Sequence, residues 1–204
     1  MSQPQPARLL RGAVNLRPLK ADDLEPLHAL LSDWNVVRTM LLPHCKTKEQ
    51  TQKCLDDLMA DSPGGAWQPV VRAIESQDTG DVIGLCGIVI LHGSEQGEIW
   101  YLVRPDHWGR GIAQQAAREL LKIGFSEMNL HRIFATCLPK NPASARVLER
   151  IGMRKEGLQL KNLKIHGAWH DCFLYAILRE EWALVVNATA VVTNTQAPGN
   201  PGGR

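Results

Sequence analysis

Hydrophobic and polar positions repeat with two different periods along this chain, and each change of period marks a boundary between predicted elements. Between residues 98 and 103 the chain alternates between two sets of positions, Ile99, Tyr101 and Val103 in one set and Glu98, Trp100 and Leu102 in the other. A period of two is typical of a β-strand. After a short turn, apolar residues recur at helical spacing: Ile112, Ala116, Leu120 and Ile123. This central segment therefore predicts a strand, a turn and a helix.

The same patterns predict the rest of the chain. Strands are expected at residues 13–18, 67–75, 82–91, 131–138, 158–164 and 172–178. A turn at residues 78–81 joins two of them into a hairpin. Helices are expected after the capping patterns that begin at Asp22 and Thr47, and at residues 142–151. Mixed strands and helices in a chain of this length favour one α/β domain, whereas residues 187–204 are polar and aperiodic and predict a flexible tail. Residues 183–192 fit a last helix or a last strand equally well.

The turn between the central strand and its helix predicts an anion-binding site. It consists of Trp108, Gly109, Arg110, Gly111, Ile112 and Ala113. The first N–H groups of the helix have no partner inside the helix, and its dipole is positive at this end, so a diphosphate fits there without a metal. The two glycines permit left-handed backbone angles and close approach of a ligand. A tight turn before a well-packed helix is the structural alternative, while Gln114 excludes the GxGxxG dinucleotide motif.

A second helix start follows at Asn141-Pro142-Ala143-Ser144. Asn141 can accept a hydrogen bond as the N-cap, and proline is favoured in the first helical turn. Alone, this motif fits an amphipathic helix with no ligand. Two helix N-termini that follow two adjacent strands, however, form one cleft that can hold a long ligand.

Composition and charge narrow the function classes. The 204 residues carry a formal net charge of +2 and contain no run of consecutive Lys or Arg, so we expect neither nucleic acid nor an anionic membrane as a partner. The five cysteines are scattered without a CxxC pair, which favours reduced thiols in a cytoplasmic protein and no metal site. No signal-peptide pattern is found at the N-terminus, and no apolar run reaches membrane-spanning length.

Four features in this order resemble the GNAT superfamily of acetyl-CoA-dependent N-acetyltransferases: the GEIWYLV strand, the WGRGIA turn, the NPASARVLERIGM helix and the GAWHDCFLYAIL strand. Within the superfamily the chain is similar to the RimJ/RimL branch, which acetylates protein N-terminal amines. The resemblance covers residues 14–182 and leaves extensions at 1–13 and 183–204. It implies an α/β GNAT fold, in which a mixed, splayed and mostly antiparallel sheet has helices on both faces.

The resemblance also implies roles for residues. The turn at 108–113 would bind the pyrophosphate of coenzyme A, and the strand residues Trp100, Tyr101, Leu102 and Val103 would pair with the pantetheine arm. Asn141 and Ser144 match positions that face the cofactor, and the serine is proposed to hydrogen-bond the departing thiolate. Glu98 lies where some members place a catalytic carboxylate. The segment with Trp34, Asn35, Arg38 and Met40 resembles the acceptor side.

One departure from the family affects the chemistry. Leu148 stands where many members have the tyrosine that protonates the thiolate. Tyr101 and Tyr175 are the only tyrosines, so only they could supply a phenol instead, although both also fit core aromatics. Glu98 shares a strand face with apolar residues, so desolvation can raise its pKa toward that of a useful base; a solvated carboxylate is the alternative.

The amine's basicity favours one acceptor. An α-amino group with a pKa of about 8 is roughly one-tenth neutral at pH 7, whereas a lysine near 10.4 is much less so. We therefore expect direct acetyl transfer to a protein N-terminal amine by a monomer or homodimer. A small amine such as a polyamine or an aminoglycoside, a non-catalytic coenzyme A-binding module and a nucleotide-binding protein remain alternatives. A strongly acidic pocket would favour the polyamine, and a neutral groove would favour the peptide.

Overall fold

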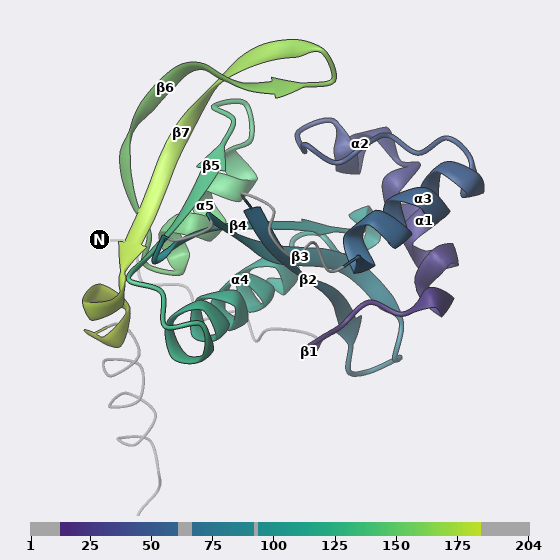
Figure 1. The fold of residues 1–204 in the computed structure, drawn as a ribbon, viewed down its shortest axis with the longest axis horizontal. Coiled ribbons are helices and arrows are strands. Elements are labelled where there is room, and N and C mark those ends of the chain that lie inside the picture. Colours follow the sequence, from purple (N-terminus) through teal and green to yellow (C-terminus); the bar gives the residue numbers. More distant parts are fainter. Residues whose placement is uncertain (1–12, 61–66, 92–93, 185–204) are drawn as a thin grey trace, which may run out of the picture.

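The computed structural model describes residues 13–60, 67–91 and 94–184 of the chain. Seven strands form one sheet in the order β1-β2-β3-β4-β5-β7-β6 (Figure 1). All neighbouring strands are antiparallel except β4 and β5, which are parallel. The strands are β1 (Val14–Arg17), β2 (Trp67–Ser76), β3 (Val82–Leu91), β4 (Gln96–Val103), β5 (Arg132–Cys137), β6 (Arg154–Ile165) and β7 (Ala168–Leu178).

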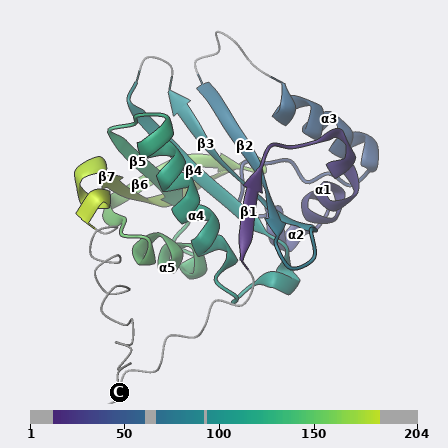
Figure 2. The same ribbon diagram turned by 90° about the horizontal axis from the view of Figure 1, so that it is seen from below.

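Helices cover both faces of this sheet (Figure 2). They are α1 (Leu24–Leu31), α2 (Trp34–Val37), α3 (Lys48–Met59), α4 (Ile112–Lys122) and α5 (Pro142–Arg150), with a π-helical turn at Ile123–Glu127 after α4. The alternation of side chains along β4 separates two apolar clusters. Ile99 and Val103 pack in the cluster that contains α4 and α5, whereas Leu102 packs in the cluster with α1, α2 and α3. The predicted α/β fold, with a mixed sheet and helices on both faces, is thus confirmed.

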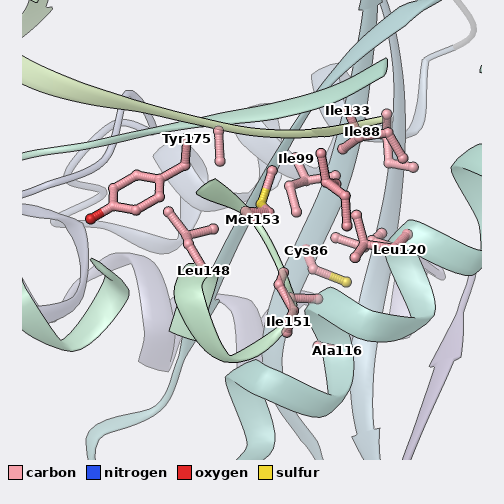
Figure 3. Packing of buried hydrophobic residues seen from close by; sticks show 14 of the residues in the cluster. Cys86, Ile88, Ile99, Ala116, Leu120, Ile133, Leu148, Ile151, Met153 and Tyr175 are labelled. Atoms are coloured by element: carbon pink, nitrogen blue, oxygen red, sulfur yellow. The ribbon is translucent and has the colours of Figure 1, made fainter. Parts of the chain in front are cut away.

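The larger cluster packs between the sheet and helices α4 and α5 (Figure 3). Leu148 from α5 belongs to this cluster and lies beside Tyr175 of β7. Both side chains are almost fully buried, with exposed fractions of 1% and 2%. Helix α5 is therefore fixed against the sheet through its apolar side, so its N-terminus has a defined position.

Several boundaries differ from the predictions. β6 and β7 together form a longer hairpin than residues 158–164 and 172–178 indicated, because β6 is an edge strand and is mostly exposed, which weakens its alternation. The hairpin turns at His166 and Gly167, where φ is +46° and +85°. Helix α2 was not predicted. Residues 179–184 are helical, while the rest of the undecided segment 183–192 and the predicted tail lie outside the described residues.

The parallel pairing between β4 and β5 is short. Only three pairs form, and the last joins Glu98 to Phe134. β4 continues to Val103 and β5 to Cys137, so the two strands diverge directly after Glu98. The sheet is thus splayed, as predicted, and a gap opens between two of its central strands.

Candidate active site

On the side that faces the gap, the backbone of β4 after Glu98 is not paired with β5. The N–H of Arg104 donates to the carbonyl of Ile83 on β3, with an N···O distance of 2.8 Å. Because backbone groups point to alternate sides along a strand, those of Tyr101 and Val103 face away from β3 and into the gap. One of these groups, the carbonyl of Val103, accepts a hydrogen bond from the indole N–H of Trp108 at 2.6 Å. The backbone of Tyr101 remains directed into the gap for a ligand that lies along the strand.

The turn before α4 has the conformation that its glycines predicted. Gly109 and Gly111 have φ values of +73° and +82°, and Gly111 is the N-cap of α4. A Cβ on Gly109 would have no atom within 4 Å, so the space beside it is open. The first N–H groups of α4 therefore face an accessible concave surface at the positive end of the helix dipole.

The start of α5 is capped as expected. The side-chain oxygen of Asn141 accepts a hydrogen bond from the backbone N–H of Ser144 at 3.2 Å, and Pro142 occupies the first turn. The cap orients Ser144 at the end of the helix that follows β5. Both helix N-termini thus lie next to the gap between β4 and β5.

A single cavity of about 760 Å³ joins these features. Its helix-end side is lined by Val103 and by described residues among 107–114 and 140–150; its apolar side is lined by residues among 35–42 and by Leu58, Pro69, Val71, Val89, Leu163 and Ile165. Glu98, Trp100 and Thr136 lie between the two sides. A cavity of this size suits a drug-sized ligand or cofactor.

Charges are distributed unevenly around this cavity. Among the described lining residues, Glu98 is the only acidic one. Three cations, Lys140, Arg146 and Arg150, lie on the helix-end side, and Arg38 lies on the apolar side. The helix-end side therefore combines basic side chains with helix N-termini and favours an anionic ligand.

Glu98 lies where the strands begin to diverge. Its Oε1 accepts a hydrogen bond from the hydroxyl of Thr136 on β5, with an O···O distance of 2.7 Å. Burial raises the pKa of the Glu98 carboxyl above its ordinary value, although the hydrogen bond from Thr136 opposes this shift. A carboxylate with a raised pKa can accept a proton more readily near neutral pH.

The two tyrosines differ in their surroundings. The Tyr101 hydroxyl lies 3.0 Å from the Ser144 hydroxyl, and both residues line the cavity. The Tyr175 hydroxyl instead donates to a carboxylate oxygen of Glu149 at 3.1 Å, and Tyr175 is not among the lining residues. Tyr175 is thus a core aromatic, and Tyr101 is the tyrosine that lines the cavity.

The β6–β7 hairpin contributes Leu163 and Ile165 to the apolar side. At its tip, Nε2 of His166 lies 3.0 Å from the carbonyl oxygen of Val37 in α2. The His166 ring also packs on Trp34, with 4.7 Å between ring centroids. Two segments about 130 positions apart in the chain therefore meet here, as Figure 1 shows for the hairpin and α2.

The structure brings nearly all the predicted site residues to this cavity. The catalytic candidates Glu98 and Ser144 line it, together with Trp100, Tyr101, Leu102, Val103, Trp108, Gly109, Gly111, Ile112, Ala113 and Asn141. Arg110 is the exception. It lines a smaller neighbouring hollow with residues such as Asp78 and Thr79 and is not among the residues that line the main cavity.

Other lining residues were missed. Thr136 contacts Glu98, and Leu163 and Ile165 come from the edge strand β6. A polar residue on the less buried face of β5 was the available signal for Thr136, because Ile133, Ala135 and Cys137 alternate with it and are buried. No sequence pattern indicated that the hairpin reaches α2.

Comparisons with known proteins identify the family of the chain. Residues 13–154 match the acetyltransferase (GNAT) domain family. The chain belongs to the GNAT family. It is 33% identical to the uncharacterized N-acetyltransferase YnaD of Bacillus subtilis over 167 residues, which are 82% of this chain and 94% of YnaD. It is an N-acetyltransferase of the acetyl-CoA-dependent GNAT type.

Solved structures show the same fold. RimJ of Mycobacterium smegmatis in complex with CoA-disulfide has a TM-score of 0.75 and 28% identity, and the match covers 89% of this chain and 92% of RimJ. The spermidine N-acetyltransferase of Vibrio cholerae in complex with CoA and spermine has a TM-score of 0.70, with 83% and 98% coverage. At 22% identity, the latter shows a shared fold only.

Two further observations concern metals and membranes. Within residues 13–60, 67–91 and 94–184, no group of three or more His, Cys, Asp or Glu side chains is arranged to hold a metal ion. Over the same residues, no helix is long and apolar enough to cross a bilayer.

Proposed function

We propose that the helix-end side of the cavity binds the pyrophosphate of acetyl-CoA and that the pantetheine arm lies in the gap beside β4. The open space beside Gly109 and the N–H groups at the start of α4 support this assignment. The backbone of Tyr101, directed into the gap, offers the pairing groups that an amide-containing arm needs. Lys140, Arg146 and Arg150 add positive charge where the ligand carries phosphates.

The acceptor is proposed to be a protein N-terminal amine, and the lining of the cavity is the observation that carries this choice. Glu98 is the only acidic residue among the described lining residues, and the apolar side carries Arg38 instead of a carboxylate. A polyamine carries several positive charges and needs several carboxylates to replace its hydration. A peptide N-terminus presents one amine next to neutral backbone, which fits an apolar pocket with a single base.

Each catalytic residue has one task in the proposed reaction. Bound acetyl-CoA supplies the acetyl group and a thiolate that leaves with the electron pair of the broken C–S bond. Glu98 accepts, directly or through water, the proton that the amine nitrogen loses as its bond to the acetyl carbon forms. Ser144 donates a hydrogen bond to the departing sulfur at the positive end of α5. The proton held by Glu98 then passes to solvent and solvent protonates the free thiolate, which restores the base and leaves the thiol of coenzyme A.

The first test is binding. Calorimetric titration with acetyl-CoA, beside ATP and NAD, should show selective micromolar affinity for acetyl-CoA. Equal or tighter binding of either nucleotide would contradict the assignment of the helix-end side.

A second test identifies the acceptor. Matched peptides with a free or a blocked N-terminus, each with one internal lysine, are incubated with the protein and acetyl-CoA beside spermidine. Mass spectrometry should locate the acetyl group on the α-amine of the free peptide, with little transfer to the blocked peptide or to spermidine. Faster acetylation of spermidine would replace the N-terminal amine by a polyamine as the substrate.

A further inference from the structure

Leu148 leaves a chemical problem on α5. A leucine cannot donate a hydrogen bond to the departing thiolate, and its side chain is almost fully buried in the core. Ser144 is therefore the hydroxyl of α5 that lines the cavity. A serine hydroxyl rotates freely unless a neighbour fixes it, so a useful donor at this point needs a partner that decides where its proton points.

Tyr101 is placed to be that partner. Its hydroxyl lies 3.0 Å from the Ser144 hydroxyl and 3.4 Å from the Ser144 carbonyl oxygen. Both neighbours accept hydrogen bonds, and the hydroxyl oxygen is the nearer one. The Ser144 side chain also has the Cys137 thiol as a neighbour, and this thiol lines the cavity as well. If the phenol donates to the serine oxygen, the serine proton cannot point back at the phenol and is available to a sulfur in the cavity.

We propose that Tyr101 is a positioning residue for Ser144: its phenolic O–H donates to Ser144 Oγ and holds the serine O–H toward the sulfur that leaves. Helix α5 has Leu148 where many members of the family have a tyrosine. Tyr101 on strand β4 supplies a phenol instead, and this phenol acts through Ser144. The inference rests on the proposed role of Ser144 but not on the identity of the acceptor amine.

The pKa values argue against Tyr101 as the acid itself. A free thiol has a pKa of about 8.5 and a free tyrosine about 10. Burial raises the pKa of Tyr101 further. A departing thiolate is thus too weak a base to remove the proton of Tyr101. Tyr101 and Ser144 therefore provide two hydrogen bonds in series and no proton transfer.

The test is a double-mutant cycle on kcat. Tyr101→Phe removes the hydroxyl and keeps the ring, and should lower kcat about tenfold, the value of one well-placed hydrogen bond. Ser144→Ala should lower kcat about 100-fold, as removal of a transition-state donor does. The double variant should be no slower than Ser144→Ala, because Tyr101 acts only through the serine. The Kd of acetyl-CoA should change by less than about twofold in all three variants.

Tyr175→Phe is the matched control, because the Tyr175 hydroxyl contacts Glu149 away from the cavity. Its kcat should equal that of the natural protein. The best acceptor of the panel above serves for every variant, whether it is a peptide or spermidine.

The outcomes separate the two proposals. A normal kcat in Ser144→Ala contradicts the role of the serine and removes the basis of the inference. A slow Ser144→Ala with a normal Tyr101→Phe overturns the inference alone, as do additive losses in the double variant or weaker acetyl-CoA binding in Tyr101→Phe. Should Tyr101→Phe not fold, replacement of Tyr101 with the more acidic 3-fluorotyrosine keeps the donor, and a large loss of kcat there would overturn the inference.

Discussion

The two sides of the cavity are built in different ways. The helix-end side depends on backbone geometry, since its main elements are the left-handed Gly109 and Gly111 and the N-termini of α4 and α5. The apolar side consists of side chains from α2 and the loop after it, α3, β2, β3 and β6, and these segments are far apart in the chain. A site made of backbone tolerates side-chain changes but not changes of conformation. A site made of side chains can change its ligand without a change of fold.

The largest expected effect is a break of the backbone-built side. Gly111→Val introduces a Cβ at φ +82°, which costs about 1–2 kcal/mol, and places side-chain atoms at the entrance to α4. We expect the affinity for acetyl-CoA to fall at least roughly 100-fold, because two or more hydrogen bonds to the phosphates are lost. Calorimetry measures this loss, and circular dichroism checks the fold.

Gly80→Val is the control for backbone strain. Gly80 has φ +74° in the β2–β3 turn, and a Cβ there meets no atom within 4 Å. The Gly80→Val variant should lose about as much folding stability as Gly111→Val but bind acetyl-CoA normally. Equal losses of affinity in both variants would show that strain, and not the phosphate site, is responsible.

Glu98 lies between the two sides, and its removal should affect turnover without affecting the donor site. Glu98→Gln is expected to lower kcat about 100-fold, the contribution of a general base. The affinity for acetyl-CoA should be unchanged. A variant that binds acetyl-CoA much more weakly would place Glu98 in the cofactor site instead.

Thr136→Val tests the pKa of the same base. The base works ionised, so the rate is lost as the pH falls through its pKa, which burial raises. The variant removes the hydrogen bond that holds this pKa down, so the acid limb of kcat/KM should move to higher pH. Comparison with the natural protein cancels the titration of the amine. A shift to lower pH would contradict the assignment.

A smaller effect is expected on the side-chain-built side. His166→Ala removes the contact between the hairpin tip and the Val37 carbonyl. The KM for the acceptor should rise about fivefold, the value of one hydrogen bond, while the Kd of acetyl-CoA stays constant. His170→Ala, in the same hairpin, is the control and should change neither value. A weaker affinity for acetyl-CoA in His166→Ala would show that the two sides are not independent.

The smallest effect concerns a side chain at the backbone-built side. Arg110→Ala should weaken acetyl-CoA binding by less than about threefold, because its charge is exposed and faces the neighbouring hollow. Arg146→Ala should weaken it more, since Arg146 lines the cavity. The reverse order of the two calorimetric affinities would contradict the geometry.

The same contrast explains what could be predicted from the sequence. Glycine spacing and the Asn-Pro-Ala-Ser cap act within a few residues, so both helix N-termini and the strands before them were predicted near their observed positions. The pairing of Tyr101 with Ser144 joins two residues 43 positions apart. The contact of His166 with Val37 spans 129 positions. Such contacts depend on how β4 and β5 diverge and on how an exposed hairpin bends. The local pattern of hydrophobic residues predicts neither of these features.

The divergence of β4 and β5 after their short parallel pairing ends at Glu98 has a consequence for self-association. A strand edge with free N–H and C=O groups normally invites a strand from another molecule. Here the unpaired edges of β4 and β5 lie inside the sheet, with β3 and β7 paired to their far sides and helix ends beside the gap. A foreign strand would have to enter between two fixed neighbours, whereas a narrow flexible chain can slide in. The backbone groups at this strand edge can thus bind a ligand, while a strand from another molecule cannot pair with them.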